Sequence, residues 1–166
     1  MVATMEGQMT EIRTFLEEHL KGILDNDISS YEATTSSDLT LYEWYVTPHR
    51  IDGLPFHEFM MIESSRKDTA GMALDPNPTG EPSEEKPRAR FDVTNYKEQR
   101  YNDTAVCSYT LLVSKGSSGG VRVLSYNETR VVVRMEEGWK VVHVHKSPSW
   151  NAPFQPPNFT RIGQEA

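Results

Sequence analysis

The first part of the chain carries apolar residues at every third or fourth position, which is the spacing of one face of an α-helix. The residues that share this face are Met9, Ile12, Phe15, Leu16, His19, Leu20, Ile23 and Leu24. The pattern predicts a long amphipathic helix with Thr10 as its N-cap, after a flexible start over residues 1–8. Asn26 and Asp27 interrupt the periodicity and predict the end of this helix.

Shorter elements are predicted over the next sixty residues. A short helix is expected over residues 28–35 and a strand over residues 39–46, where the order is LTLYEWYV. Gly53 and Pro55 mark the start of a further helix that reaches to about residue 66. Residues 67–88 contain four prolines, two glycines and many charges. This composition predicts an insertion loop, because it offers too little apolar surface to bury.

The second half of the chain has the composition of β-strands. Strands are predicted over residues 89–99, 104–114, 121–135 and 139–147, and a proline-rich tail over residues 150–166. Helices first and long strands afterwards predict an α+β domain over residues 9–149, with the helices on one face of a curved antiparallel sheet. The length of 166 residues suits one such domain.

The turn between the last two strands sets their pairing. Residues 136–138, with the sequence EEG, fit a type I turn whose last residue takes a positive φ. The expected cross-strand pairs are Met135 with Trp139, Arg130 with Val144 and Glu128 with Lys146. A two-residue turn at Glu137 and Gly138 would instead pair Arg130 with His145. We favour the first register, and the second stays open at this point.

Period two then divides this hairpin into two faces. One face is expected to hold Glu128, Arg130, Lys140, Val142, Val144 and Lys146. The opposite face is expected to hold Val131, Val133, Met135, Trp139, Val141, His143 and His145. Both faces carry apolar side chains, so both are expected to be covered. The chain's own helices would cover one face and a second subunit the other, which makes Trp139, Val141, His143, His145, Val133 and Met135 interface candidates.

Charge and composition limit the classes of partner. The chain has 24 acidic and 17 basic residues, a net charge of -7, which argues against nucleic acid as a partner because that role needs a basic surface. No stretch approaches 18 consecutive apolar residues and the start lacks the apolar core of a signal peptide, so we expect no membrane partner and a cytoplasmic location. Cys107, the single cysteine, is expected to be buried and unreactive.

Six segments give the chain a family resemblance. They are ILDNDISSYE (23–32), LTLYEWY (39–45), IDGLPFHEF (51–59), DTAVCSYT (103–110), NETRVV (127–132) and GWKVVHVHKS (138–147). In their order and spacing the chain resembles the association, or hub, domain of calcium/calmodulin-dependent protein kinase II, within the nuclear-transport-factor-2-like superfamily. The resemblance runs from about residue 9 to residue 149, outside the insertion.

The resemblance implies a fold and a function. The fold would be cystatin-like and cone-shaped, with a long N-terminal helix packed in a strongly curved antiparallel sheet and a cavity inside. The function would be oligomerisation, with dimers of this chain assembled into a stacked ring of about twelve or more subunits. The expected partners are therefore other copies of the chain and a kinase domain in cis or in trans; calmodulin binding is implied by the same family. The chain shows no ATP-binding or catalytic kinase motif, so we expect no enzyme and no cofactor.

The resemblance also points to candidate ligand-binding residues. Hub cavities are lined by three arginines and take small carboxylates; Arg130 matches the second arginine, Lys146 replaces the third, and Leu111 stands at the first. Other pocket candidates are Glu43, Tyr109, Glu128 and His57. The cations could bind a carboxylate ligand, or could be neutralised inside the domain by Glu43 and Glu128. A buried cation needs an anion in either case, and both readings stay open.

The histidines suggest two further kinds of site, a metal site and a general base. His143 and His145 lie on one strand face, as two metal ligands would, but no third ligand follows, so no metal site is predicted. His57 as a general base would suit the alternative function, a small-molecule-binding protein or an isomerase- or dehydratase-like enzyme of the same fold. The aspartate and tyrosine pattern of ketosteroid isomerases is not found in the sequence.

Overall fold

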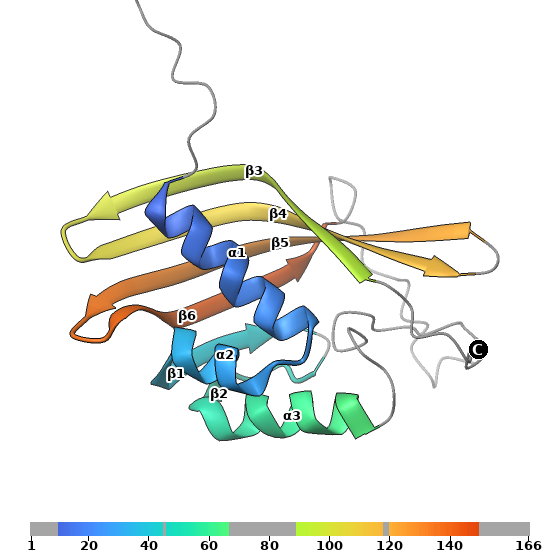
Figure 1. The fold of residues 1–166 in the computed structure, drawn as a ribbon, viewed down its shortest axis with the longest axis horizontal. Coiled ribbons are helices and arrows are strands. Elements are labelled where there is room, and N and C mark those ends of the chain that lie inside the picture. The colour runs from blue at the N-terminus through green and yellow to red at the C-terminus, as the bar shows by residue number, and fades with distance from the viewer. Residues whose placement is uncertain (1–9, 45, 67–88, 118–119, 150–166) are drawn as a thin grey trace, which may run out of the picture.

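The computed structural model describes residues 10–44, 46–66, 89–117 and 120–149. The predicted flexible start, insertion loop and proline-rich tail lie outside the described residues. The elements are α1 (Glu11–Leu24), α2 (Ile28–Thr34), β1 (Thr35–Glu43), β2 (Ile51–Asp52), α3 (Leu54–Arg66), β3 (Ala89–Tyr101), β4 (Thr104–Ser117), β5 (Gly120–Met135) and β6 (Gly138–Pro148). They form one sheet with the helices on one side of it (Figure 1), which confirms the predicted α+β class.

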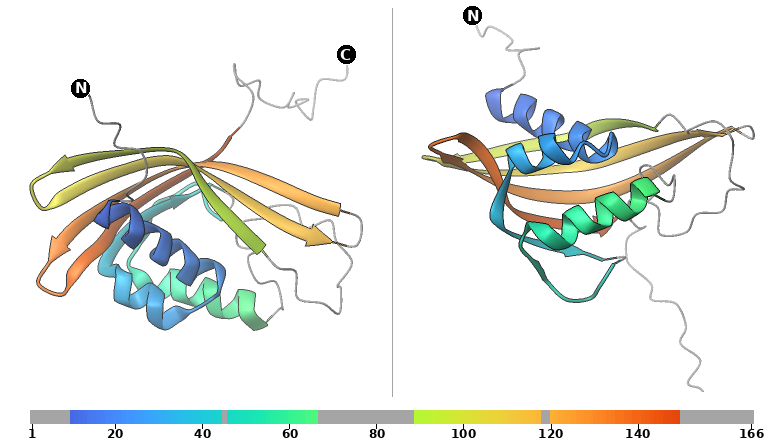
Figure 2. Two further views of the ribbon diagram at one scale, coloured as in Figure 1. Left: turned by 45° about the horizontal axis from the view of Figure 1, so that its top comes forward. Right: turned by 60° about the horizontal axis from the view of Figure 1, so that its bottom comes forward.

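The sheet has the strand order β2-β1-β6-β5-β4-β3. Every neighbouring pair is antiparallel except β1 and β6, which run parallel. The sheet bends strongly and the three helices lie within the bend, as the two views of Figure 2 show. We call the face that the helices cover the inner face and the opposite face the outer face.

Helix α1 forms where the apolar periodicity predicts it. The Thr10 side chain accepts a hydrogen bond from the backbone N–H of Arg13 at 3.1 Å, so Thr10 is the N-cap. Asn26 follows the helix with a positive φ of 59°, a conformation that ends a helix and that asparagine tolerates. Its side chain donates to the carbonyl of Met61 at 2.9 Å and so ties this corner to α3.

The boundaries of β1 differ from the prediction. The strand begins at Thr35, directly after α2, and ends at Glu43, whereas residues 39–46 were expected. Serine and aspartate in the sequence TSSD (35–38) have little β propensity, and within this stretch Thr35 pairs with Val141 of β6 before a register irregularity that ends at Thr40. The two-residue strand β2 is also absent from the prediction, because two residues carry no periodicity.

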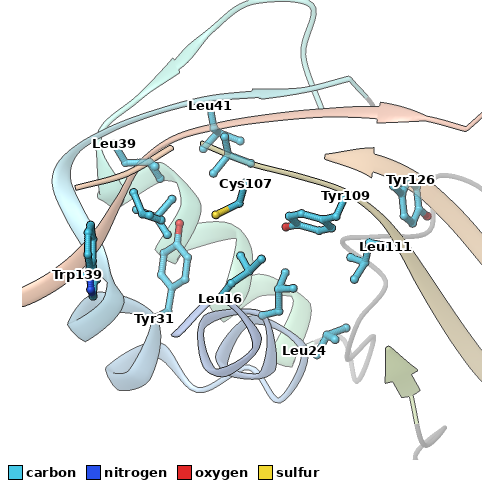
Figure 3. Packing of buried hydrophobic residues seen from close by; sticks show 14 of the residues in the cluster. Leu16, Leu24, Tyr31, Leu39, Leu41, Cys107, Tyr109, Leu111, Tyr126 and Trp139 are labelled. Carbon is cyan, nitrogen blue, oxygen red and sulfur yellow. The ribbon is translucent and has the colours of Figure 1, made fainter. Parts of the chain in front are cut away.

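The core lies between α1 and the inner face of the sheet. Apolar side chains from α1, β1 and β4 meet there (Figure 3), among them Leu16, Leu41 and Leu111. Cys107 is fully buried in this core, as predicted, and burial raises the pKa of its thiol. Among the described residues, no helix is long and apolar enough to cross a membrane.

The register of the last hairpin follows the prediction over most of its length. Arg130 pairs with Val144 and Glu128 pairs with Lys146. Gly138 has a φ of 115°, as the turn requires. Near the turn the prediction is wrong, because Met135 pairs with Gly138 and not with Trp139. A β-bulge after Val141 absorbs the one-residue difference between the two halves of the hairpin.

Candidate functional site

The six predicted pocket residues all lie buried on the inner side of the sheet. Their side chains come from four strands and one helix: Glu43 (β1), His57 (α3), Tyr109 (β4), Glu128 and Arg130 (β5) and Lys146 (β6). Each residue is less than one tenth exposed, and Arg130 and Glu43 are 1% exposed. The strand register and the bend bring them beneath the helices. Two groups of contacts result.

The first group surrounds Arg130. Tyr109 and Glu128 face each other across β4 and β5, and the Tyr109 hydroxyl donates to Oε2 of Glu128 at 2.7 Å. Nη1 of Arg130 donates to the same Glu128 oxygen and to the Tyr109 hydroxyl. Burial raises the pKa of Tyr109 well above its ordinary value, so the phenol keeps its proton. Burial opposes the charge of Arg130, but the Glu128 carboxylate outweighs it and the pKa of Arg130 is raised.

The second group joins Lys146 to α3 and α2. Nζ of Lys146 donates to Oε1 of Glu43 at 2.5 Å, and Nε2 of His57 lies 3.7 Å from the other oxygen of Glu43. Nδ1 of His57 contacts the hydroxyl of Tyr31. Burial lowers the pKa of His57 to about 4, against the opposing effect of Glu43, so the imidazole is neutral at pH 7. Burial likewise raises the pKa of Tyr31.

His19, on α1, is a buried polar residue that the sequence did not single out as a site. Its Nδ1 lies 2.8 Å from Oγ1 of Thr34. The Thr34 hydroxyl donates to the carbonyl of Ser30, so its oxygen accepts from Nδ1–H and leaves Nε2 of His19 unprotonated. Burial lowers the pKa of His19 well below its ordinary value, and the charge of Arg130 adds to this effect. His19 is therefore neutral.

These two groups of contacts balance the charge of the interior. Arg130 is paired with Glu128, and Lys146 with Glu43. Among the described residues, the other buried titratable side chains of these groups are neutral at pH 7 for the reasons above. Leu111, at the position where the resemblance implies the first arginine, belongs to the apolar core. The sequence left open whether these cations bind a carboxylate ligand or are neutralised inside the domain. The observed ion pairs are those of the second alternative.

The outer face carries four of the six predicted interface candidates. Val133 follows the buried Val132 on β5, His143 and His145 flank the buried Val144 on β6, and Met135 is exposed near the turn. His143 contacts Oγ1 of Thr40 through Nδ1 at 2.8 Å. The ring of Tyr42 lies 5.3 Å from that of His145 and 6.4 Å from that of His143. The predicted grouping of the two histidines on one face is confirmed.

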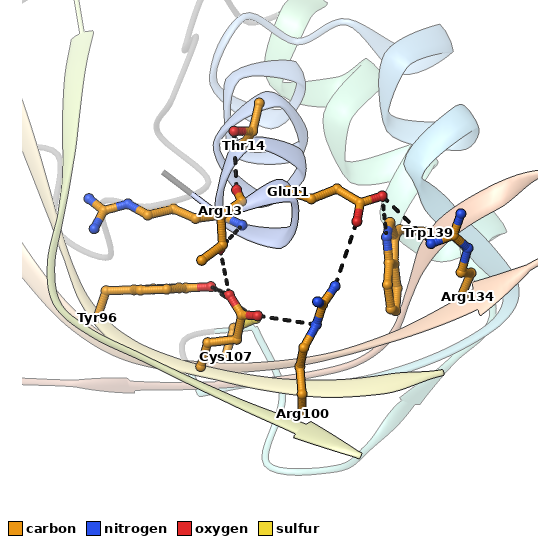
Figure 4. A network of polar contacts seen from close by, with 10 residues as sticks. Glu11, Arg13, Thr14, Tyr96, Arg100, Cys107, Arg134 and Trp139 are labelled. Atoms are coloured by element: carbon orange, nitrogen blue, oxygen red, sulfur yellow. Dashed lines mark hydrogen bonds and ion pairs between the residues drawn. The ribbon is translucent and has the colours of Figure 1, made fainter. Parts of the chain in front are cut away.

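Lys140 pairs with Val133 on the outer face and does not share the face of Arg130, so its predicted face is wrong. The face predicted for Trp139 and Val141 is also wrong. The bulge after Val141 turns both side chains to the inner face, where Val141 is fully buried and Trp139 is 9% exposed. The indole N–H of Trp139 donates to Glu11 at the start of α1, at 3.1 Å. Arg100 and Arg134 lie near the indole ring, 5.6 and 5.7 Å from its centroid, and both are ion-paired with Glu11 (Figure 4). These residues hold the first turn of α1 to the sheet.

A hollow of about 310 Å³ opens on the outer side of the sheet. Two of the predicted pocket residues, Tyr109 and Glu128, are among the residues that line it, with Asn95, Ser108, Thr110, Asn127, Thr129, His145 and Ser147. It does not include the cations of the interior. Within the described parts of the chain, no group of three or more His, Cys, Asp or Glu side chains is placed to hold a metal ion.

A bent sheet that wraps a long N-terminal helix, with a buried polar network under it, defines a nuclear-transport-factor-2-like domain. An NTF2-like protein from Cytophaga hutchinsonii shares this fold at a TM-score of 0.58 and 16% identity, over 84% of this chain and 99% of that one. A family model narrows the class. Residues 8–76 and 83–150 match the calcium/calmodulin-dependent protein kinase II association domain, and the chain belongs to that family.

Individual relatives agree with this assignment. The delta subunit of calcium/calmodulin-dependent protein kinase type II from Oryctolagus cuniculus is 23% identical over 154 residues, which are 92% of this chain and 26% of that protein. The chain therefore spans about a quarter of that relative. The structure of the CaMKII hub homology domain of Chlamydomonas reinhardtii superposes with a TM-score of 0.67 at 23% identity, over 84% of this chain and 97% of that one. The CaMKII hub of S. rosetta gives a TM-score of 0.64.

Proposed function

We propose that this chain is an oligomerisation hub whose copies assemble into a closed, ring-shaped homo-oligomer. The observation that carries the proposal is the family match over both halves of the chain. The outer face supports it, because the outward positions 104–112 of β4, 127–133 of β5 and 143–147 of β6 hold no lysine, arginine, aspartate or glutamate. Lys140, which lies opposite Val133, is already paired with Glu137. In a chain with a net charge of -7, such a face is where copies can approach with little repulsion.

The assembly would bring together whatever is attached to each copy. The relative from Oryctolagus cuniculus is a kinase subunit of which this chain matches about a quarter. We propose that a kinase domain, joined to this chain or recruited by it, would be clustered by the ring. A putative ketosteroid isomerase from Shewanella frigidimarina shares the fold at 13% identity and a TM-score of 0.54, a likeness that extends to the architecture alone.

A charge on the outer face tests the proposal. Val133→Glu places a carboxylate at a half-buried outer position of β5. Native mass spectrometry of the unmodified chain is expected to give a large ring, of order ten or more subunits. Because the carboxylates of facing copies repel and lose solvation, the variant is expected to show mainly dimers or monomers at the same concentration.

The matched control is Ser29→Glu, on the exposed surface of α2, away from the outer face of the sheet. It adds the same charge to the chain and should leave the ring intact. A monomer or dimer for the unmodified chain would contradict the hub proposal. An intact ring for Val133→Glu would remove this part of the outer face from the contact and leave assembly itself standing.

We further propose that the interior cations of this chain serve the fold and leave little affinity for a small carboxylate. Each cation already has a carboxylate partner, so an incoming anion would bury a third negative charge between two positive ones. Thermal-shift titration with acetate and butyrate at constant ionic strength is expected to raise the melting temperature no more than chloride does. A saturable rise with butyrate, absent with chloride, would contradict this and would favour the carboxylate pocket that the resemblance implies.

A further inference from the structure

Tyr42, His143 and His145 form a compact cluster on the outer face. They lie on the adjacent strands β1 and β6, in register, with Tyr42 opposite His145 and Thr40 opposite His143. The Thr40 hydroxyl holds His143 through Nδ1, and the Tyr42 ring contacts both imidazoles. Tyr42 is 38% exposed although it is large and aromatic. Aromatic side chains placed in this way are typical of contact surfaces between proteins.

We propose that this cluster is a proton-sensitive contact between two copies of the chain, an inference that rests on the hub function proposed above. Nδ1 of His143 is held by Thr40, so His143 offers its Nε2 to a second copy. A neutral imidazole at His145 offers one donor and one acceptor, and the Tyr42 hydroxyl can donate and accept. The cluster therefore offers complementary groups to its own copy across a two-fold axis. The uncharged outer positions of β4, β5 and β6 continue the same surface.

The charged groups around the cluster do not neutralise an added proton. On β5, the residues opposite His143 and His145 are Val131 and Thr129, which are uncharged. On β2, Asp52 lies opposite Thr40 but is already bound to Arg50, with Nε 2.6 Å from the carboxylate. A proton on either imidazole would therefore remain an uncompensated positive charge.

Protonation weakens the contact in two ways. It converts the acceptor nitrogen of each imidazole into a donor, so the two clusters no longer complement each other. It also places positive charges face to face. Burial, with a further contribution from His145, already lowers the pKa of His143 within one copy, and a covering copy would lower it further. The assembled state thus binds fewer protons than separate copies, and acid favours separation.

The test is the size of the assembly as a function of pH. Sedimentation velocity of the full chain is expected to show assembly at pH 7.5 and dissociation by pH 5, with the dissociation constant raised at least about a hundredfold. Because asparagine keeps one donor and one acceptor but does not titrate, the double variant His143→Asn, His145→Asn is expected to stay assembled at pH 5. Circular dichroism at each pH reports whether the fold is intact.

His49→Asn is the control, since His49 is an exposed histidine of the same chain. It is expected to dissociate at the same pH as the unmodified chain. A double variant that dissociates with the unmodified pH dependence would overturn the proposal, as would an unmodified chain that stays assembled at pH 5. Those two outcomes would leave the hub function standing. If the unmodified chain fails to assemble at pH 7.5, the hub function itself fails, and the histidine contact fails with it.

Discussion

Replacing Arg130 by methionine is expected to lower the free energy of unfolding by about 3–5 kcal/mol. Arg130 is 1% exposed and its only charged partner among the described residues is Glu128. The substitution leaves the Glu128 carboxylate buried without a counter-charge and removes one hydrogen bond from Tyr109. Urea unfolding followed by tryptophan fluorescence, at equal subunit concentrations, measures the change.

Two further variants make this prediction specific. In the double variant Glu128→Gln, Arg130→Met both charges are gone, so much of the lost stability should return. Arg90→Met is the exposed counterpart. Like Arg130, Arg90 is paired with a carboxylate two residues away on its own strand, that of Asp92. This variant should leave the unfolding midpoint unchanged, because exposed ion pairs contribute little. Equal losses for the Arg130 and Arg90 variants would contradict a buried, compensated pair.

Arg130 lies in a hairpin whose register the sequence predicts in part. The predicted pairs of Arg130 with Val144 and of Glu128 with Lys146 are observed, but the predicted pair at the turn is wrong, and the bulge after Val141 makes up the one-residue difference. The prediction used local signals, since period two and the φ of the turn glycine depend on neighbouring residues alone. The same signals placed both strands of the hairpin in the sheet.

The sequence could not predict where the strands bend. The bulge after Val141 shows no sign in the run of valines and histidines, yet it moves Trp139 and Val141 from the expected outer face into the core. The contacts of Trp139 with Glu11 and of His57 with Tyr31 join residues 128 and 26 positions apart. Such pairings follow from how α1 packs on the sheet and α3 packs on α2, which no periodicity encodes.

His57 makes the stability of the domain depend on pH. Its pKa is lowered to about 4 in the fold, mainly by burial, and is about 6.5 in an unfolded chain. The unfolded state therefore binds more protons below pH 6.5, so the stability present above that pH is lost as the pH falls toward 4. Between pH 7 and pH 5 the loss due to His57 is expected to be about 2 kcal/mol.

The variant His57→Gln isolates this effect. Glutamine can still hydrogen-bond Tyr31 and Glu43 but cannot take up a proton. Between pH 7 and pH 5, the free energy of unfolding should therefore fall by about 2 kcal/mol less in the variant than in the chain that keeps His57. Urea unfolding at both pH values is compared in the His143→Asn, His145→Asn background, because assembly there is expected not to change with pH. His49→Gln, at an exposed position, should keep the original pH dependence. An unchanged pH dependence for His57→Gln would mean that His57 becomes protonated within the fold, beside Glu43.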